Sequence, residues 1–398
     1  MHSGPSCDSK KTQGTERSSI PTAMSGPTIL QVLHQGGGAG SVTSTLHLSL
    51  GLARSGIHIR FVCPPDSEVE ALAVVGGLEV HPLALLPRQR QTNAGRLADL
   101  LARNPADLIN SQSSRDRQAL TWLALTGRLR APLVVTRRQM PRTFILENWL
   151  VSRAAARVIA VSKAVGEALV RRGTSRRKLT VIPNGLVTDR VDVPVAPPQL
   201  ATWRERIGWE PDRRTIGVVA RPKDQDVLLR ALSYVRTPIR LVLAGVDPGS
   251  RLAALATGVP ETHRVVCLPF TSDVRPLYDL LELVLLPSRS EGLSQSLLEA
   301  MALGKPVIAS AATGNLEVIS DRVNGRLVPP PDPRAWASAI DELLENRELA
   351  ERLAAAGRHT ARVTFALEHT IRQTARLYDE VLTTSHQERT RLPGAAAW

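Results

Sequence analysis

The 398-residue chain carries a formal net charge of +13 and 43% hydrophobic residues, but only 3% aromatic residues. Its length predicts two globular domains, its apolar share excludes a chain that is disordered throughout, and its few aromatic residues argue against a stacking platform for single-stranded nucleic acid. The positive charge predicts anionic partners such as nucleotide phosphates or an anionic membrane surface. The cysteines, Cys7, Cys63 and Cys267, lack metal-ligand spacing, and no apolar run is long enough to span a membrane. We therefore expect a cytoplasmic protein whose membrane contact, if any, is peripheral and at the inner face.

The order of elements along the chain predicts two α/β domains. Residues 1–26 are polar and lack periodicity, which predicts a disordered leader. Over 27–190, short β-branched runs alternate with amphipathic segments, as in a doubly wound parallel sheet with helices on both faces. A proline-rich stretch then predicts a linker over 191–212, the alternation returns over 213–366, and 367–398 is expected to form a helix and tail that return to the first domain. The expected strands are 29–33, 59–63, 107–110, 133–136, 158–161 and 179–182, followed by 216–220, 241–244, 265–268, 283–286 and 307–309.

The stretch 285–309 carries the strongest functional pattern, because it reads as strand, loop, helix and strand. Ser294 predicts the N-cap of the helix, and Gly304 predicts its left-handed end. The loop before this helix follows a parallel strand, and ligands bind at that edge of open α/β sheets. The backbone amides of Gly292, Leu293 and Ser294 therefore predict a site for a phosphate.

Two glutamates accompany these amides. Glu291 would repel a phosphate, so it is better suited to accepting hydrogen bonds from sugar hydroxyls. Glu299, on the helix, is placed for a ribose diol. Without the surrounding pattern, both acids would read as solvated surface residues.

This segment resembles the Glu-x7-Glu motif of glycosyltransferase family 4, the group 1 family of retaining GT-B enzymes, in its two glutamates and in its flanking Pro-Ser, Glu-Gly, Glu-Ala-Met-Ala and Gly-x-Pro-Val elements. Gly314 and Asn315 resemble the family's small-residue turn that approaches the donor. The resemblance implies two facing Rossmann-like domains, a C-terminal helix that crosses back to the first domain, a nucleotide-sugar donor, and no metal or other cofactor. Because the pattern is closest to bacterial lipopolysaccharide and cell-envelope members, it also implies a glycolipid or saccharide acceptor of that type.

Two further segments resemble the same family. Gly36, Gly37 and Gly38 resemble its N-terminal glycine loop, where backbone without side chains lets a ligand approach closely. The third glycine of a dinucleotide-binding fingerprint is absent, which argues against a nicotinamide cofactor. Arg221 and Lys223 stand where the family has cations that neutralise the donor diphosphate, although they are closer in sequence than is usual.

Gln112 and Arg138 depart from the family pattern, because histidines are usual at both places. Neither residue can exchange a proton near neutral pH. In a retaining reaction the donor phosphate can take the proton instead, and His34 is a conceivable substitute base. The departures leave two alternatives open: a catalytically weakened protein that binds nucleotide sugars or glycans, and a GT-B nucleotide-sugar epimerase. A nucleic-acid partner is not expected, because zinc spacing and aromatic-basic interleaving are both missing.

Overall fold

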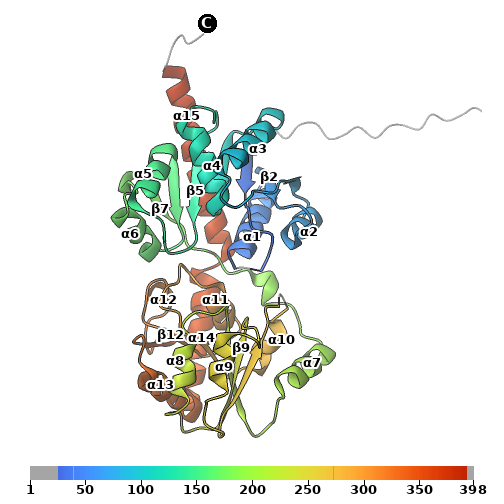
Figure 1. Ribbon diagram of the computed structural model, residues 1–398, viewed down its shortest axis with the longest axis vertical. Helices are drawn as coiled ribbons and strands as arrows, with labels where there is room; N and C mark the ends of the chain where they lie inside the picture. The colour runs from blue at the N-terminus through green and yellow to red at the C-terminus, as the bar shows by residue number, and fades with distance from the viewer. Residues whose placement is uncertain (1–25, 39, 272, 392–398) are drawn as a thin grey trace, which may run out of the picture.

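The computed structural model of the protein describes residues 26–38, 40–271 and 273–391. Two α/β domains lie one above the other along the longest axis (Figure 1). The predicted leader, apart from Gly26, lies outside the described residues, as does the last part of the predicted tail. No helix in the described chain is both long enough and apolar enough to cross a membrane.

The N-terminal domain is built on a parallel seven-stranded sheet in the order β3-β2-β1-β4-β5-β6-β7. Its strands are β1 (Thr28–Val32), β2 (His58–Cys63), β3 (Glu79–Pro82), β4 (Leu108–Ser111), β5 (Leu133–Arg137), β6 (Arg157–Ala160) and β7 (Leu179–Val181). Its α-helices are α1 (Gly40–Arg54), α2 (Glu68–Val75), α3 (Arg90–Arg103), α4 (Ser114–Leu125), α5 (Ile145–Ala154) and α6 (Lys163–Arg171). The central strands β4 and β5 are buried at every residue, as expected where helices cover both faces of a parallel sheet.

The C-terminal domain has a parallel six-stranded sheet in the order β10-β9-β8-β11-β12-β13. Its strands are β8 (Arg214–Val219), β9 (Ile239–Ala244), β10 (Arg264–Leu268), β11 (Leu283–Leu286), β12 (Val307–Ser310) and β13 (Arg326–Val328). Its α-helices are α7 (Pro197–Ile207), α8 (Asp226–Ala231), α9 (Arg251–Ala256), α10 (Arg275–Leu280), α11 (Gln295–Ala302), α12 (Asn315–Val318), α13 (Pro333–Glu345) and α14 (Arg347–His359). Helix α7 lies inside the range predicted as a linker; it packs against α10 and buries Trp203 and Ile207.

The chain returns to the first domain at its C-terminal end. A π-helical segment (Thr360–Thr364) follows α14, and α15 (Leu367–Arg391) then runs from the second domain along the first (Figure 1). Helix α15 packs against α1, and its buried Tyr378 accepts hydrogen bonds from Gln31 at 2.9 Å and Asn110 at 2.6 Å. Two Rossmann-like domains with a helix that crosses back confirm the predicted fold.

Candidate functional site

The loop between β11 and α11 presents unpaired backbone donors. Ser294 caps α11 by accepting a hydrogen bond from the amide of Leu297, and Gly304 follows the helix with a φ of 69°. In the described part of the chain, no group accepts a hydrogen bond from the amides of Gly292, Leu293 or Ser294. Unpaired amides at the start of a helix favour an anion, so this loop has the donors that a phosphate requires.

Two cations from the segment after β8 reach loops of different domains. Lys223 Nζ lies 2.8 Å from Glu291 Oε1, and Arg221 donates a hydrogen bond to the carbonyl of Gly38 in the first domain. Glu291 is only 8% exposed, whereas the Lys223 side chain is 46% exposed. A half-exposed ammonium can change partners readily, so Lys223 can hold Glu291 or contact an incoming anion. The structure thus pairs one predicted diphosphate cation, Lys223, with the predicted sugar-binding carboxylate, whereas the other, Arg221, contacts the glycine loop of the first domain.

The glycine loop after β1 fits between α2 and the second domain. Gly38 has a φ of 66°, a left-handed conformation that a residue without a Cβ atom adopts at little cost. A Cβ atom would come within 2.9 Å of Ser67 if placed on Gly36, and within 2.8 Å of Glu68 if placed on Gly37. Gly36 and Gly38 therefore depend on the absence of a side chain, whereas the Glu68 side chain could turn away from a Cβ atom on Gly37.

Direct contacts hold the two domains closed around the loop between β11 and α11, here named the donor loop after its predicted role. A Cβ atom on Gly292 would lie 2.3 Å from the backbone oxygen of Arg138, which follows β5 of the first domain. From α12 in the second domain, the Glu317 carboxylate accepts hydrogen bonds from the amides of Lys163 and Ala164, each at 2.8 Å. These amides begin α6, where the helix dipole stabilises a negative charge. The described conformation therefore has little space between the loop and the first domain.

Glu299 lies in a buried ion pair. Its Oε1 is 3.1 Å from Arg190 Nε, and its Oε2 accepts a hydrogen bond from the Tyr278 hydroxyl at 3.4 Å. Burial raises the pKa of Glu299, although Arg190 and the Tyr278 hydrogen bond act in the opposite direction. Burial and the neighbouring Glu299 also raise the pKa of Tyr278 well above its usual value. Sequence reasoning missed Arg190 and Tyr278, because neither belongs to a motif of recognisable spacing.

Gly314 and Asn315 position the loop that carries Glu291. The Gly314 amide lies 3.3 Å from the Glu291 carbonyl oxygen, to which it donates. The Asn315 side chain donates to the carbonyls of Ser288 at 3.4 Å and Ser310 at 3.1 Å. Both residues are buried. This turn, predicted to approach the donor, therefore connects the ends of β11 and β12 behind the loop.

Gln112 and Arg138 come together, but in a buried polar network inside the first domain. Gln112 donates to Gln31 at 2.7 Å and accepts from Arg138 at 3.0 Å, and Arg138 also donates to Asn184. Burial lowers the pKa of Arg138 to about 10. Gln31 links the network to Tyr378 of α15. It is thus the backbone of Arg138, and not its guanidinium, that meets the donor loop.

His34 has a carboxylate partner that the sequence did not reveal. His34 Nδ1 lies 3.1 Å from Asp116 Oδ1 and 2.5 Å from the Ser113 hydroxyl oxygen. Fully buried Asp116 also accepts from the amides of Gln112 and Ser113 and from the Ser111 hydroxyl, each at 2.8 Å. Burial raises the pKa of Asp116, but hydrogen bonds from His34 and Ser113 and the charge of His34 outweigh it, so the pKa lies below its usual value. A carboxylate at Nδ1 fixes the ring and favours Nε2 as a proton acceptor.

Asp116 should make the free energy of unfolding depend on pH in the acid range. Because its pKa is lowered in the folded state, the ionised carboxylate contributes stability above the unfolded pKa of 3.8, and this is lost as the pH falls through the folded pKa. We expect Asp116→Asn to lower the free energy of unfolding by about 2–4 kcal/mol at neutral pH, and by less at an acid pH below 3.8, where Asp116 of the folded protein begins to be protonated. Urea unfolding at both pH values measures this, with exposed Asp99→Asn as the control. An equal loss at both pH values would contradict the assignment.

Both domains match family models. The model described as Glycosyltransferase Family 4 matches residues 38–190, and the model described as Glycosyl transferases group 1 matches residues 201–360. The chain is similar to the D-inositol 3-phosphate glycosyltransferase of Xylanimonas cellulosilytica, with 33% identity over 235 residues. That alignment covers 56% of this chain and 56% of the relative, so the chain spans little more than half the length of this curated protein.

Solved structures share the fold over most of the chain. The structure of Anabaena Alr3699/HepE in complex with UDP and glucose matches with a TM-score of 0.77 and 22% identity, covering 89% of this chain and 100% of that one. WaaG, a glycosyltransferase involved in lipopolysaccharide biosynthesis, matches with a TM-score of 0.66 and 17% identity, covering 88% and 99%. With both family models matched in order and with two Rossmann-like domains in the GT-B arrangement, the chain belongs to the group 1 glycosyltransferases of family 4.

Proposed function

We propose that the protein is a retaining glycosyltransferase that moves a sugar from a nucleotide-sugar donor to a glycolipid or lipopolysaccharide-type acceptor of the cell envelope. The observation that carries this proposal is that Lys223 pairs with Glu291, beside the unpaired amides of Gly292 and Leu293, while Arg221 of the same segment reaches the glycine loop of the first domain. The UDP and glucose of the HepE structure support a nucleotide-sugar donor, and the role of WaaG supports the acceptor class.

In this proposal the donor diphosphate meets the amides of the α11 loop together with Arg221 and Lys223. These cations stabilise the negative charge that builds on the leaving nucleoside diphosphate as the bond from the sugar C1 atom to the phosphate oxygen breaks. Glu291 accepts hydrogen bonds from sugar hydroxyls. Glu299 binds the ribose diol by exchanging its bond to Arg190. Because protein cations supply the positive charge, the reaction needs no metal.

The acceptor hydroxyl attacks C1 from the face that the leaving group departs, which retains the configuration. The new bond joins C1 to the acceptor oxygen, and the hydroxyl proton passes to an oxygen of the departing phosphate. His34, fixed by Asp116 at the end of β1, offers a second place for this proton. Gln112 and Arg138 act through the buried network as positioning residues.

A ligand panel tests the proposal on the purified full chain. Nucleoside diphosphates and their sugars should raise the melting temperature, because a ligand that binds only the folded state stabilises it. With an envelope lipid extract present, the matching nucleotide sugar should release its diphosphate, and EDTA should leave the rate unchanged. Failure of every nucleotide to raise the melting temperature would refute the proposal. Binding without transfer would indicate a binding protein, and donor conversion without an acceptor would indicate an epimerase.

A further inference from the structure

The start of α5 exposes a cluster of large apolar side chains. Phe144 is 85% exposed, Ile145 64%, Leu146 65% and Trp149 52%. These four residues, here named the α5 patch, lie within one short segment of the N-terminal domain. Single exposed apolar residues are normal on a soluble protein, but a contiguous cluster marks an interaction surface.

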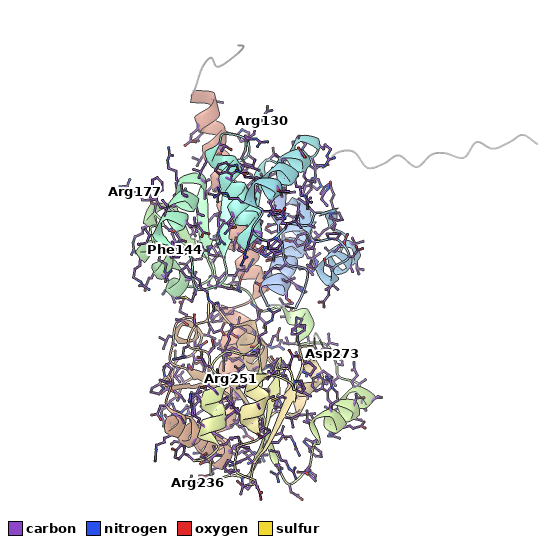
Figure 2. All side chains as sticks on the ribbon, in the orientation of Figure 1. Arg130, Phe144, Arg177, Arg236, Arg251 and Asp273 are labelled. Atoms are coloured by element: carbon purple, nitrogen blue, oxygen red, sulfur yellow. The ribbon has the colours of Figure 1, made fainter. Side chains whose placement is uncertain are left out.

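Exposed arginines lie on the elements that carry and adjoin the α5 patch. Arg172 donates to the carbonyl of Thr143 at 2.9 Å, and a Cβ atom on Gly173 would lie 3.3 Å from the Ile145 side chain, so the end of α6 adjoins the patch. The exposed arginines of this region, here named the arginine rim, are Arg142, Arg153, Arg171, Arg172, Arg176 and Arg177. Among the described residues, Arg171 alone of the rim pairs with a carboxylate, that of Glu167 at 3.7 Å. Figure 2 shows Phe144 and Arg177 on the same side of the domain.

A second apolar cluster on the same domain provides a contrast. Helix α2 exposes three residues, Leu72, Val74 and Val75. The charged residues in and next to this helix are all acidic: Asp66, Glu68 and Glu70. Of these two clusters, the α5 patch is the one that combines apolar side chains with positive charge that no described carboxylate pairs.

We propose that the α5 patch and the arginine rim dock the N-terminal domain on an anionic lipid bilayer. Apolar side chains of an interfacial helix enter the boundary between headgroups and acyl chains, where tryptophan is especially favourable. Arginines bind lipid phosphates and are attracted by the negative surface potential. A second copy of the chain fits less well, because a two-fold contact would bring two arginine rims together.

The position of the patch connects this surface to the site. Thr143 and Asn148, beside the patch residues in sequence, both hydrogen-bond the Arg137 side chain at the end of β5. Arg138, the next residue, is the one whose backbone meets Gly292 of the donor loop. Docking would thus hold the end of the first domain that contacts the donor loop close to the lipid surface. The docking surface is inferred without the proposed function. Only its role, to bring the enzyme to a lipid-linked acceptor, rests on that function.

Vesicle flotation of the full chain tests the docking surface without donor or acceptor. We expect binding to equimolar phosphatidylcholine and phosphatidylglycerol, weakening as salt is added, and little binding to phosphatidylcholine alone. Phe144→Gln with Trp149→Gln should lower the partition coefficient about tenfold or more. Leu72→Gln with Val75→Gln is the matched control and should bind like the wild type.

Three results would overturn the inference: absence of wild-type binding, equal loss in the α2 control, or a dimer that Phe144→Gln with Trp149→Gln dissociates in light scattering. Thermal melts of both double variants establish that they fold. If flotation fails while nucleotide-sugar turnover persists, only the docking inference falls. If nucleotides neither bind nor turn over while flotation succeeds, only the proposed function falls.

Discussion

Replacing Glu291 or Arg221 with alanine should lower nucleotide-sugar turnover by about two to three orders of magnitude. In the proposed reaction Arg221 supplies charge that the leaving diphosphate needs, and in the structure it reaches across to the glycine loop. Glu291 is buried beside Lys223, so its removal would lose the proposed sugar contact and leave a cation without its partner. Both kcat and kcat/KM should fall, because the lost interactions strengthen in the transition state.

An ion pair at the far end of the same domain provides matched controls. Arg236 lies 2.9 Å from Glu345 on the surface away from the first domain (Figure 2). Arg236→Ala and Glu345→Ala remove the same residue types from an exposed pair, which contributes little to stability. Arg236 also pairs with the buried Asp341 carboxylate, which keeps its hydrogen bonds from the amides of Arg236 and Thr237. Their turnover should stay within about twofold of the wild type. Wild-type turnover in Glu291→Ala or Arg221→Ala would show that the reaction takes place elsewhere.

The sequence predicts the interior of both sheets and misses an edge strand in each. Strand β11, with the sequence Leu-Val-Leu-Leu, is buried at every residue, so it appears as a continuous apolar run. The missed strands are β3, with the sequence Glu-Val-His-Pro and no buried residue, and β13, with three residues. Edge strands are half solvated and short, so their residues carry little apolar pattern.

In the candidate site, too, the sequence predicts local features but not contacts between distant segments. Local sequence predicts the cap of α11 and the amides before it, because helix starts and ends depend on neighbouring residues. The partners of the site residues come from distant segments: Asp116 for His34, Arg190 for Glu299, and the α6 amides for Glu317. The spacing of residues along the chain does not predict such contacts. They arise only when the two sheets and the returning helix bring strand ends together.

Gly292→Ala should prevent the closed contact between the domains without preventing either domain from folding. The added methyl group would meet the Arg138 backbone oxygen at 2.3 Å, and neither partner is a flexible side chain that can turn aside. Because the clash lies between the domains, each domain can still fold. We expect Gly292→Ala to keep its melting temperature within a few degrees and to lose about a hundredfold in kcat, since small displacements of reacting groups are costly. Small-angle scattering should show a larger radius of gyration.

Gly314→Ala should behave differently, because its methyl group would meet the Gly292 carbonyl oxygen at 2.0 Å within the second domain. That clash distorts the donor loop itself, so the variant should lose nucleotide binding and stability together. Gly249→Ala, where a Cβ atom meets nothing within 4 Å, is the control for the substitution alone. If Gly292→Ala retained wild-type kcat, the closed contact between Arg138 and the loop would not be the catalytic arrangement. If instead Gly292→Ala and Gly314→Ala lost stability equally, Gly292 would be needed for the folding of the second domain and not for the contact between the two domains.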